Sequence, residues 1–357
     1  MPERAMSGNS SDQDALNGPA LPQPDGVVPN FDNPSKDNTA GYVLMSVYLA
    51  LGTLAMLVRV YARIFCTRKV RIEDLLGLAG FICYVIFAWG CYTILDFPGF
   101  YVHQWDVRLK DLSRILYPFY ITSNAYSDAI GFLKAAILVE WSRIFNPRGI
   151  RNTFFWVCHT VLWVNILYYV ASAISINLTC FPHQKIWDKT ITDGTCINSN
   201  ALYLSGTIIN LLSDLVIFYT PQSVIWGLKL STSKKVGVSL IFAIGVLCVV
   251  VAIVRLVTTA QHLTQTDFVY TLAVQFFVAG SEIFLVLLVF CAPTFPQAVR
   301  SLRNKSPLGS GQGDSHQTSG SSWVGTRNAE RQTSDYRKIE EHSLVTLATT
   351  APPGSAL

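Results

Sequence analysis

The chain has 357 residues, of which 50% are hydrophobic and only 14% are charged, and its formal net charge is +4. Water-soluble domains carry about 25% charged residues, so this composition excludes an ordinary soluble protein and favours one surrounded by lipid. The small net charge gives no reason to expect a nucleic-acid partner, and the lipid bilayer is the partner that the composition predicts.

The two ends of the chain differ from its middle in composition. The first 40 residues are rich in Pro, Gly, Asn, Ser and Asp and contain no apolar stretch, so we expect 1–40 to be a disordered extracellular tail without a cleavable signal peptide. Asn9 begins an Asn-Ser-Ser pattern, which predicts an N-glycosylation site on this tail. Residues 306–357 are rich in Ser, Thr and Gly, and we expect a disordered cytoplasmic tail.

Seven apolar segments separate these tails, each close to the ~20 residues that a helix needs to cross the bilayer. Because a backbone in lipid must satisfy its own hydrogen bonds, we expect each segment to be helical. The predicted fold is an all-α membrane protein in which residues 41–305 form a bundle of seven transmembrane helices. The segments are 41–65, 74–97, 113–145, 153–180, 201–228, 235–261 and 268–292.

The links between the segments predict the orientation, because Lys and Arg favour the cytoplasmic side. The links after the first, third, fifth and seventh segments are basic, whereas the link after the sixth, HLTQTD, contains neither residue type. The link after the second segment is a mild exception, since its basic residues are partly offset by Asp106 and Asp111. We therefore expect the amino terminus outside and the carboxyl terminus in the cytoplasm.

Two of the eight cysteines, Cys180 and Cys196, fall in the same predicted extracellular link. Oxidising conditions there favour a disulfide, which should stabilise the fold by about 3 kcal/mol for a loop of this length. The histidines of the outer links, His103, His183 and His262, show no metal-ligand spacing. We expect no metal, no other cofactor and no catalytic residue.

Polar side chains form stripes along the third, fifth and seventh predicted helices, and the sixth contributes Arg255. The sequence NAYSD at 124–128 is echoed by NLLSD at 210–214, at matching predicted depth in helices that run in the same direction. Five unpaired ionisable groups in hydrocarbon would cost on the order of 12–17 kcal/mol, so we expect the stripes to converge. The predicted cluster comprises Asn124, Asp128, Lys134, Asn210, Asp214, Arg255 and Glu282.

Two interpretations of this cluster stay open. It can be a network that fixes helix register, or a ligand or proton site, because buried ionisable groups in membranes often mark such sites. The pairing is open as well: Arg255 can reach Asp128, Asp214 or Glu282, and Lys134 can reach a partner on another helix such as Glu282.

Short motifs occur in a fixed order along residues 41–305. They are RVYAR, the ED before the second segment, GFYVH, the SRIF that follows Lys134, CFPHQKIWD with GTC, SDLVIFYTP with KLSTSKK, Arg255, and Glu282 leading to CAP. Through them the chain resembles the fungal rhodopsin-like domain family of integral membrane proteins, of the satratoxin-cluster type related to proposed fungal pathogenicity receptors. Tyr101 and Ala136 depart from the family pattern, which usually has Gly and Ser there.

The resemblance does not imply light sensing, because a retinal protein needs a lysine in its last helix and segment 268–292 has none. Our leading hypothesis is a receptor-like multi-pass protein of the plasma membrane that senses a small extracellular molecule and acts on a cytoplasmic signalling partner. An endomembrane is the alternative location. The alternative function is a membrane-embedded enzyme or accessory protein of a secondary-metabolite pathway, although we favour a protein that is not an enzyme.

Overall fold

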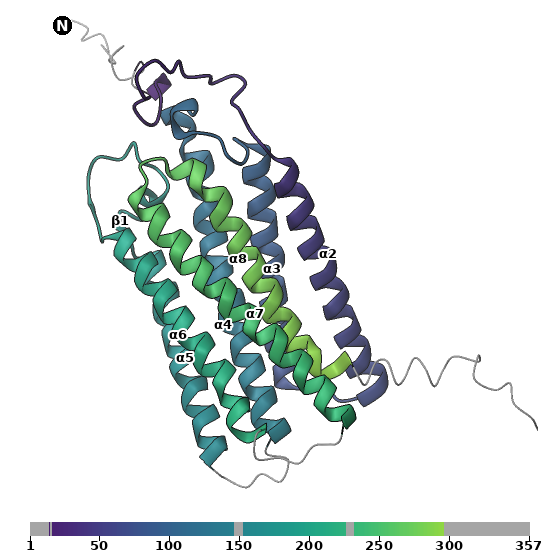
Figure 1. The fold of residues 1–357 in the computed structure, drawn as a ribbon. Coiled ribbons are helices and arrows are strands. Elements are labelled where there is room, and N and C mark those ends of the chain that lie inside the picture. Colours follow the sequence, from purple (N-terminus) through teal and green to yellow (C-terminus); the bar gives the residue numbers. More distant parts are fainter. Residues whose placement is uncertain (1–13, 15, 146–152, 226–231, 296–357) are drawn as a thin grey trace, which may run out of the picture. The chain divides into compact units, whose positions relative to one another are not determined.

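Seven long helices make up most of the chain that the structure, a computed structural model, describes, namely residues 14, 16–145, 153–225 and 232–295. Figure 1 shows these helices running alongside one another. They lie close to the seven predicted segments, which confirms the all-α prediction for the described residues. Their bounds are α2 Thr39–Tyr61, α3 Ile72–Asp96, α4 Ser113–Phe145, α5 Thr153–Asn177, α6 Ser199–Ile225, α7 Thr232–Thr264 and α8 Phe268–Cys291.

Short elements occupy the links. A π-helix, η1, continues α2 over Ala62–Thr67, and strands β1 and β2 pair antiparallel with Cys180 opposite Cys196. The remaining elements are the 3-10 helices η2 Gln104–Asp106, η3 Leu109–Asp111, η4 His183–Ile186 and η5 Ala292–Thr294, and the strands themselves span Cys180–Phe181 and Thr195–Cys196.

Six of the long helices are long and apolar enough to cross a membrane, and α4 is not among them. Large apolar side chains such as Leu54 and Leu57 of α2 and Leu167 of α5 are about 60% exposed or more, which fits helices surrounded by lipid rather than water. The protein is therefore a multi-pass membrane protein. The seventh crossing and the orientation stay predictions.

Helix α4 falls short because it carries the polar stripe, and its packing explains how that stripe is tolerated. It contacts α3, α5, α6 and α8, and Ala129, Ile130 and Leu133 are fully buried. A Cβ atom at Gly90 of α3 would meet Thr122 of α4 at 1.9 Å, so the glycine lets these two helices approach closely. Most of the α4 surface consequently meets protein.

Residues 17–38 lie against the link between α3 and α4. Ala20 N donates to Val107 O at 2.8 Å, and Phe100 N donates to Asn38 Oδ1 at 2.8 Å. The link between α3 and α4 thus supplies hydrogen-bond partners to residues 17–38 that the polar composition of this segment does not reveal. The predicted disorder of residues 1–40 stays a prediction. Residues 1–13, with Asn9, and 306–357 lie outside the described residues, and the domain boundaries at 40 and 305 stay predictions.

Candidate functional site

Two ion pairs join four helices in the middle of the bundle. Lys134 Nζ of α4 lies 2.8 Å from Asp214 Oδ1 of α6, and Arg255 Nη1 of α7 lies 2.9 Å from Glu282 Oε2 of α8. Lys134, Asp214 and Glu282 are buried. The predicted convergence holds for these four residues, and the structure supplies the pairing that the sequence left open.

Asn210 of α6 connects the two pairs. Its Oδ1 accepts from Lys134 Nζ at 2.8 Å and from Tyr169 Oη of α5 at 2.8 Å, while its Nδ2 donates to Glu282 Oε1 and, at 3.4 Å, to Asp214 Oδ2. One amide thereby bridges a lysine–aspartate pair and the glutamate of the other pair. We call Lys134, Asn210, Asp214, Arg255 and Glu282 the central network.

Most polar atoms of the central network have partners. Lys134 Nζ donates to Asn210 Oδ1, to Asn210 O at 3.3 Å and to Asp214, which uses all three donors of an ammonium group. Glu282 Oε1 accepts from Asn210, and Oε2 accepts from Arg255 and from Tyr126 Oη at 2.9 Å. Lys134 and Glu282 therefore meet the usual condition for a buried charge, which is that it is both ion-paired and hydrogen-bonded.

Arg255 is the exception. Its Nη1 donates to Glu282, and the guanidinium lies over the Tyr126 ring, 3.6 Å from the ring centre. Its Nε is buried without a hydrogen-bond partner, and no described residue accepts from Nη2. The side chain is 18% exposed, and Arg255 lines the cavity described next.

A cavity of about 450 Å³ lies beside Arg255 and is lined by residues of α3 to α8 and of the links around them. Its volume falls within the range of sites for drug-sized molecules, about 300–1,000 Å³. Asn210 and Arg255 belong to both the cavity wall and the central network. Aromatic and aliphatic side chains form much of the remaining wall, among them Leu116, Phe119, Ile176, Phe268 and Phe276.

Two of the predicted cluster residues lie apart from the central network. Asn124 Oδ1 accepts from Asn177 Nδ2 of α5 at 3.0 Å, and Asp128 makes no side-chain hydrogen bond or ion pair with any described residue. The echo between NAYSD and NLLSD therefore does not extend to ion pairing among the described residues, because Asp214 pairs with Lys134 and Asp128 does not. A ligand-binding role for any of the seven residues stays a prediction.

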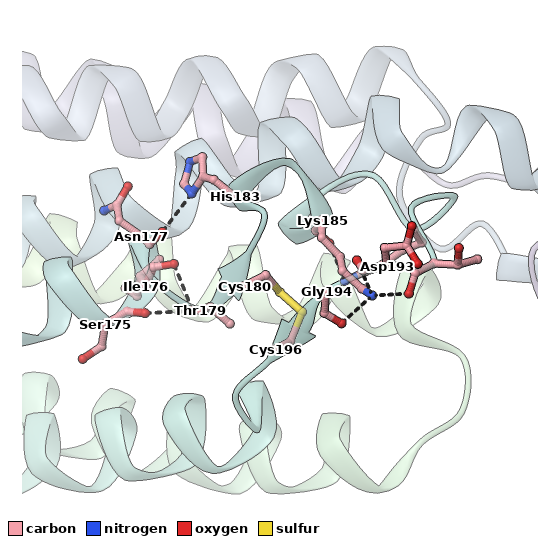
Figure 2. The surroundings of a disulfide bond; sticks show 12 residues. Ser175, Ile176, Asn177, Thr179, Cys180, His183, Lys185, Asp193, Gly194 and Cys196 are labelled. Atoms are coloured by element: carbon pink, nitrogen blue, oxygen red, sulfur yellow. Dashed lines mark hydrogen bonds between the residues drawn. A yellow bond between two sulfur atoms is a disulfide. The ribbon is translucent and has the colours of Figure 1, made fainter.

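The predicted disulfide between Cys180 and Cys196 is present, and Figure 2 shows it closing the hairpin between α5 and α6. Within that hairpin Lys185 Nζ donates to the carbonyl oxygens of Thr192, Asp193 and Gly194 at 2.8–3.1 Å. Cys180, Ile186 and Lys189 line the cavity, so the cross-linked hairpin forms part of its wall.

Lys189 lies outside the membrane-crossing helices, and burial together with the charge of Lys185 lowers its pKa.

The three histidines predicted to lie in outer links have different surroundings, and His262 lies within α7. His103 Nδ1 lies 2.7 Å from Asp267 Oδ2, and His183 Nδ1 lies 2.8 Å from Asn177 O, whereas His262 lines the cavity. Among the described residues no group of three or more His, Cys, Asp or Glu side chains is arranged to hold a metal ion.

A second set of buried charges lies where α2, α3 and α4 meet. Arg59 donates to Asp74 Oδ1 at 2.9 Å through Nη2 and to Glu140 Oε2 at 3.0 Å through Nη1, and Arg63 binds the same two carboxylates at 3.1 and 2.6 Å. Arg59 also donates to Phe290 O of α8 and lies over the Phe290 ring. We call Arg59, Arg63, Asp74 and Glu140 the α2/α3 cluster.

Sequence reasoning missed this cluster, although a signal for it exists. Arg59 and Arg63 are four residues apart and so share one helix face, but arginine near the end of an apolar segment also indicates orientation. Glu140 lies six residues beyond Lys134 on α4, outside the predicted polar stripe. Tyr126 and Tyr169 were missed because tyrosine in an apolar helix gives no charge signal.

Several membrane-crossing helices around a cavity with a charged, hydrogen-bonded base define a multi-pass helical membrane protein with an interior site. A family profile described as the Fungal rhodopsin domain matches residues 58–301, which is more than half of the chain. The chain belongs to this family, as its motifs indicated.

Three relatives illustrate the range of the family. "Fugralins biosynthesis cluster protein 2" of Gibberella zeae is 37% identical over 287 residues, 80% of this chain and 71% of the relative. "SAT4 family membrane protein" of Emericella nidulans is 29% identical over 211 residues, 59% of this chain and 53% of the relative. "Receptor GIN3" of Arthrobotrys oligospora is 24% identical over 213 residues, which are 58% of this chain and 49% of the relative. The chain thus matches about half the length of the latter two.

Proposed function

We propose that this protein is a receptor-like membrane protein that binds a small extracellular molecule in the cavity and acts on a cytoplasmic signalling partner. The observation that carries the proposal is that Asn210 and Arg255 belong both to the cavity wall and to the central network. A ligand that moves Arg255 changes the pairing that joins α4, α6, α7 and α8, and so favours one arrangement of these helices. The relative named as a receptor supports this reading.

The proposal includes seven crossings, with the amino terminus outside and the protein in the plasma membrane. Helix α4 has 33 residues and is about 50 Å long at 1.5 Å per residue, which is enough to cross, and its polar face meets protein. Enzymatic removal of N-glycans should increase the gel mobility of the wild type but not of Asn9→Gln. Absence of a glycan, together with protection of an amino-terminal tag from external protease, contradicts this orientation.

Ligand binding is tested with the full-length protein in lipid nanodiscs and a library of small molecules, scored by the shift in thermal unfolding temperature. Gly206 lines the cavity, and a Cβ atom there meets only Tyr168 Oη, at 3.5 Å. Leucine at this position therefore fills part of the cavity without a backbone clash. We expect compounds that stabilise the wild type to lose their effect on Gly206→Leu. Equal stabilisation of both proteins would show that the cavity is not the site.

Transmission is tested in cells that respond to such a compound. Asp214→Asn and Arg255→Gln keep side-chain size and remove one charge each, so they should abolish the response while surface expression is retained. A normal response in both variants contradicts the proposal.

A second candidate is a component of a secondary-metabolite pathway, favoured by the relative named as a biosynthesis cluster protein. The sequence offers Asp128, Asp214 and Glu282 as acids for such chemistry, but none of the three is among the described residues that line the cavity. Comparison of metabolites between a deletion strain and its parent distinguishes the two candidates. A missing or stalled product favours the pathway role, and an altered response to chemical cues with unchanged products favours reception.

A further inference from the structure

The charged side chains that line the cavity are of one sign. Arg255 at the central network and Lys189 of the disulfide hairpin are among the described lining residues, and no aspartate or glutamate is. Glu282 lies behind Arg255 and is fully buried. A molecule in the cavity therefore meets cationic and neutral donors but no free carboxylate.

The hydrogen bonds of the central network show which group a ligand has to supply. Both oxygens of Glu282 accept from protein donors, and the Lys134 ammonium has three acceptors. Within the network, the nitrogen atoms without a described acceptor are Nε and Nη2 of Arg255. A buried donor without a partner costs about 1–3 kcal/mol, so an acceptor that reaches Arg255 relieves this cost.

The geometry of the guanidinium limits which acceptor groups of a ligand can bind it. Nε and Nη2 lie on one edge of the planar group, and that edge matches the two oxygens of a carboxylate. Nη1 donates to Glu282, and the guanidinium lies over the Tyr126 ring. Because Nε is buried, a ligand reaches both nitrogens only if the side chain turns toward the cavity, whose wall it already helps to form. An amide or ester carbonyl offers one oxygen acceptor and leaves one of the two donors unmet.

The rest of the wall indicates what accompanies the acid group. The rings of Phe268 and Phe276 each pack against Phe119, with ring centres 5.3 and 6.2 Å away, and Leu116 and Ile176 extend the apolar surface. A ligand that buries apolar surface against this wall is stabilised by about 25 cal/mol per Å² of that surface. Serine, threonine and tyrosine hydroxyls elsewhere in the lining tolerate additional polar substituents.

We propose that the cavity takes a small amphipathic carboxylic acid, with its carboxylate on the Nε and Nη2 edge of Arg255 and its apolar body along the aromatic wall. This inference rests on the proposed function, whose ligand class it specifies. The positive charge of Lys189 in the lining compensates the added anion, since the central network itself is neutral, with two cations and two carboxylates.

The test uses 6-phenylhexanoic acid, its primary amide and its methyl ester, which share the apolar body and differ at the acid group. Binding to the full-length protein in nanodiscs is measured by the shift in unfolding temperature over a concentration series, with empty nanodiscs as the partitioning control. We expect the acid to bind about tenfold more tightly than the amide or the ester, as a charge-assisted hydrogen bond implies. In Arg255→Gln this preference should fall below about threefold.

Three further variants keep the result interpretable. Arg255→Lys retains the charge without the planar edge and should give an intermediate preference, whereas Arg108→Gln removes an arginine outside the cavity lining and should keep the full preference. Gly206→Leu should weaken all three probes. Equal binding of acid and amide to the wild type, or failure of the acid to bind, overturns the inference. Binding that is unaffected by Gly206→Leu removes the cavity site itself and overturns the proposed function as well.

Discussion

Arg59 and Arg255 are both arginines in buried ion pairs, yet their surroundings differ. Arg59 is 1% exposed, and all three of its guanidinium nitrogens donate to described acceptors. Arg255 is 18% exposed and uses one nitrogen. The α2/α3 cluster has the properties of a structural clamp, whereas the central network keeps donors available beside a cavity. Both arginines belong to buried ion pairs, so the ion pair alone does not distinguish them; the number of guanidinium nitrogens that have a described acceptor does.

The largest expected effect belongs to Arg59→Met. Removing this guanidinium leaves Asp74 and Glu140 buried with fewer partners, and such a loss costs about 3–5 kcal/mol. Reversible unfolding by a denaturing detergent measures the change. If Arg59→Met is less destabilising than Arg255→Gln, the distinction between clamp and binding arginine is wrong.

Lys134→Met should cost about 3 kcal/mol, because Asp214 is then buried without its cation. The double variant Lys134→Met with Asp214→Leu replaces the whole pair by apolar groups and should recover at least about half of that loss. The same unfolding measurement applies to both proteins. If the double variant recovers stability but not a ligand response, the Lys134–Asp214 pair is needed for signalling and not for packing. That result would sharpen the contrast between the α2/α3 cluster and the central network.

Arg255→Gln should destabilise by only about 1–2 kcal/mol, since Glu282 keeps its hydrogen bonds from Tyr126 and Asn210. The expected signature is a small change in stability together with a complete loss of response. A loss of stability as large as that of Arg59→Met would indicate that the central network is a clamp too.

Arg108→Gln should have the smallest effect. Arg108 lies 3.4 Å from Asp32, whose side chain is 95% exposed, and solvent weakens such pairs. Its unfolding midpoint should agree with that of the wild type within experimental error, which calibrates the other three measurements. A clear loss of stability here would indicate that the contacts of residues 17–38 with the α3–α4 link matter to the whole fold.

The helices and the convergence of charges could be predicted because both follow from the cost of polar groups in hydrocarbon. The pairing could not, since several carboxylates lie at similar depth and side-chain reach exceeds the differences between them. Asp128 was misplaced because a stripe about 120° wide specifies a face without specifying which neighbour each residue meets. The α2/α3 cluster was overlooked because arginines at a helix end carry two meanings, orientation and pairing.

The disulfide hairpin has a practical consequence for anyone preparing this protein. Cys180 belongs to the covalent bond and to the cavity wall at once. Expression where thiols stay reduced leaves this cross-link unformed, and we expect the helices to form while this part of the cavity wall loses its fixed position. Negative results from such preparations carry no weight unless the oxidation of this one cysteine pair has been verified first.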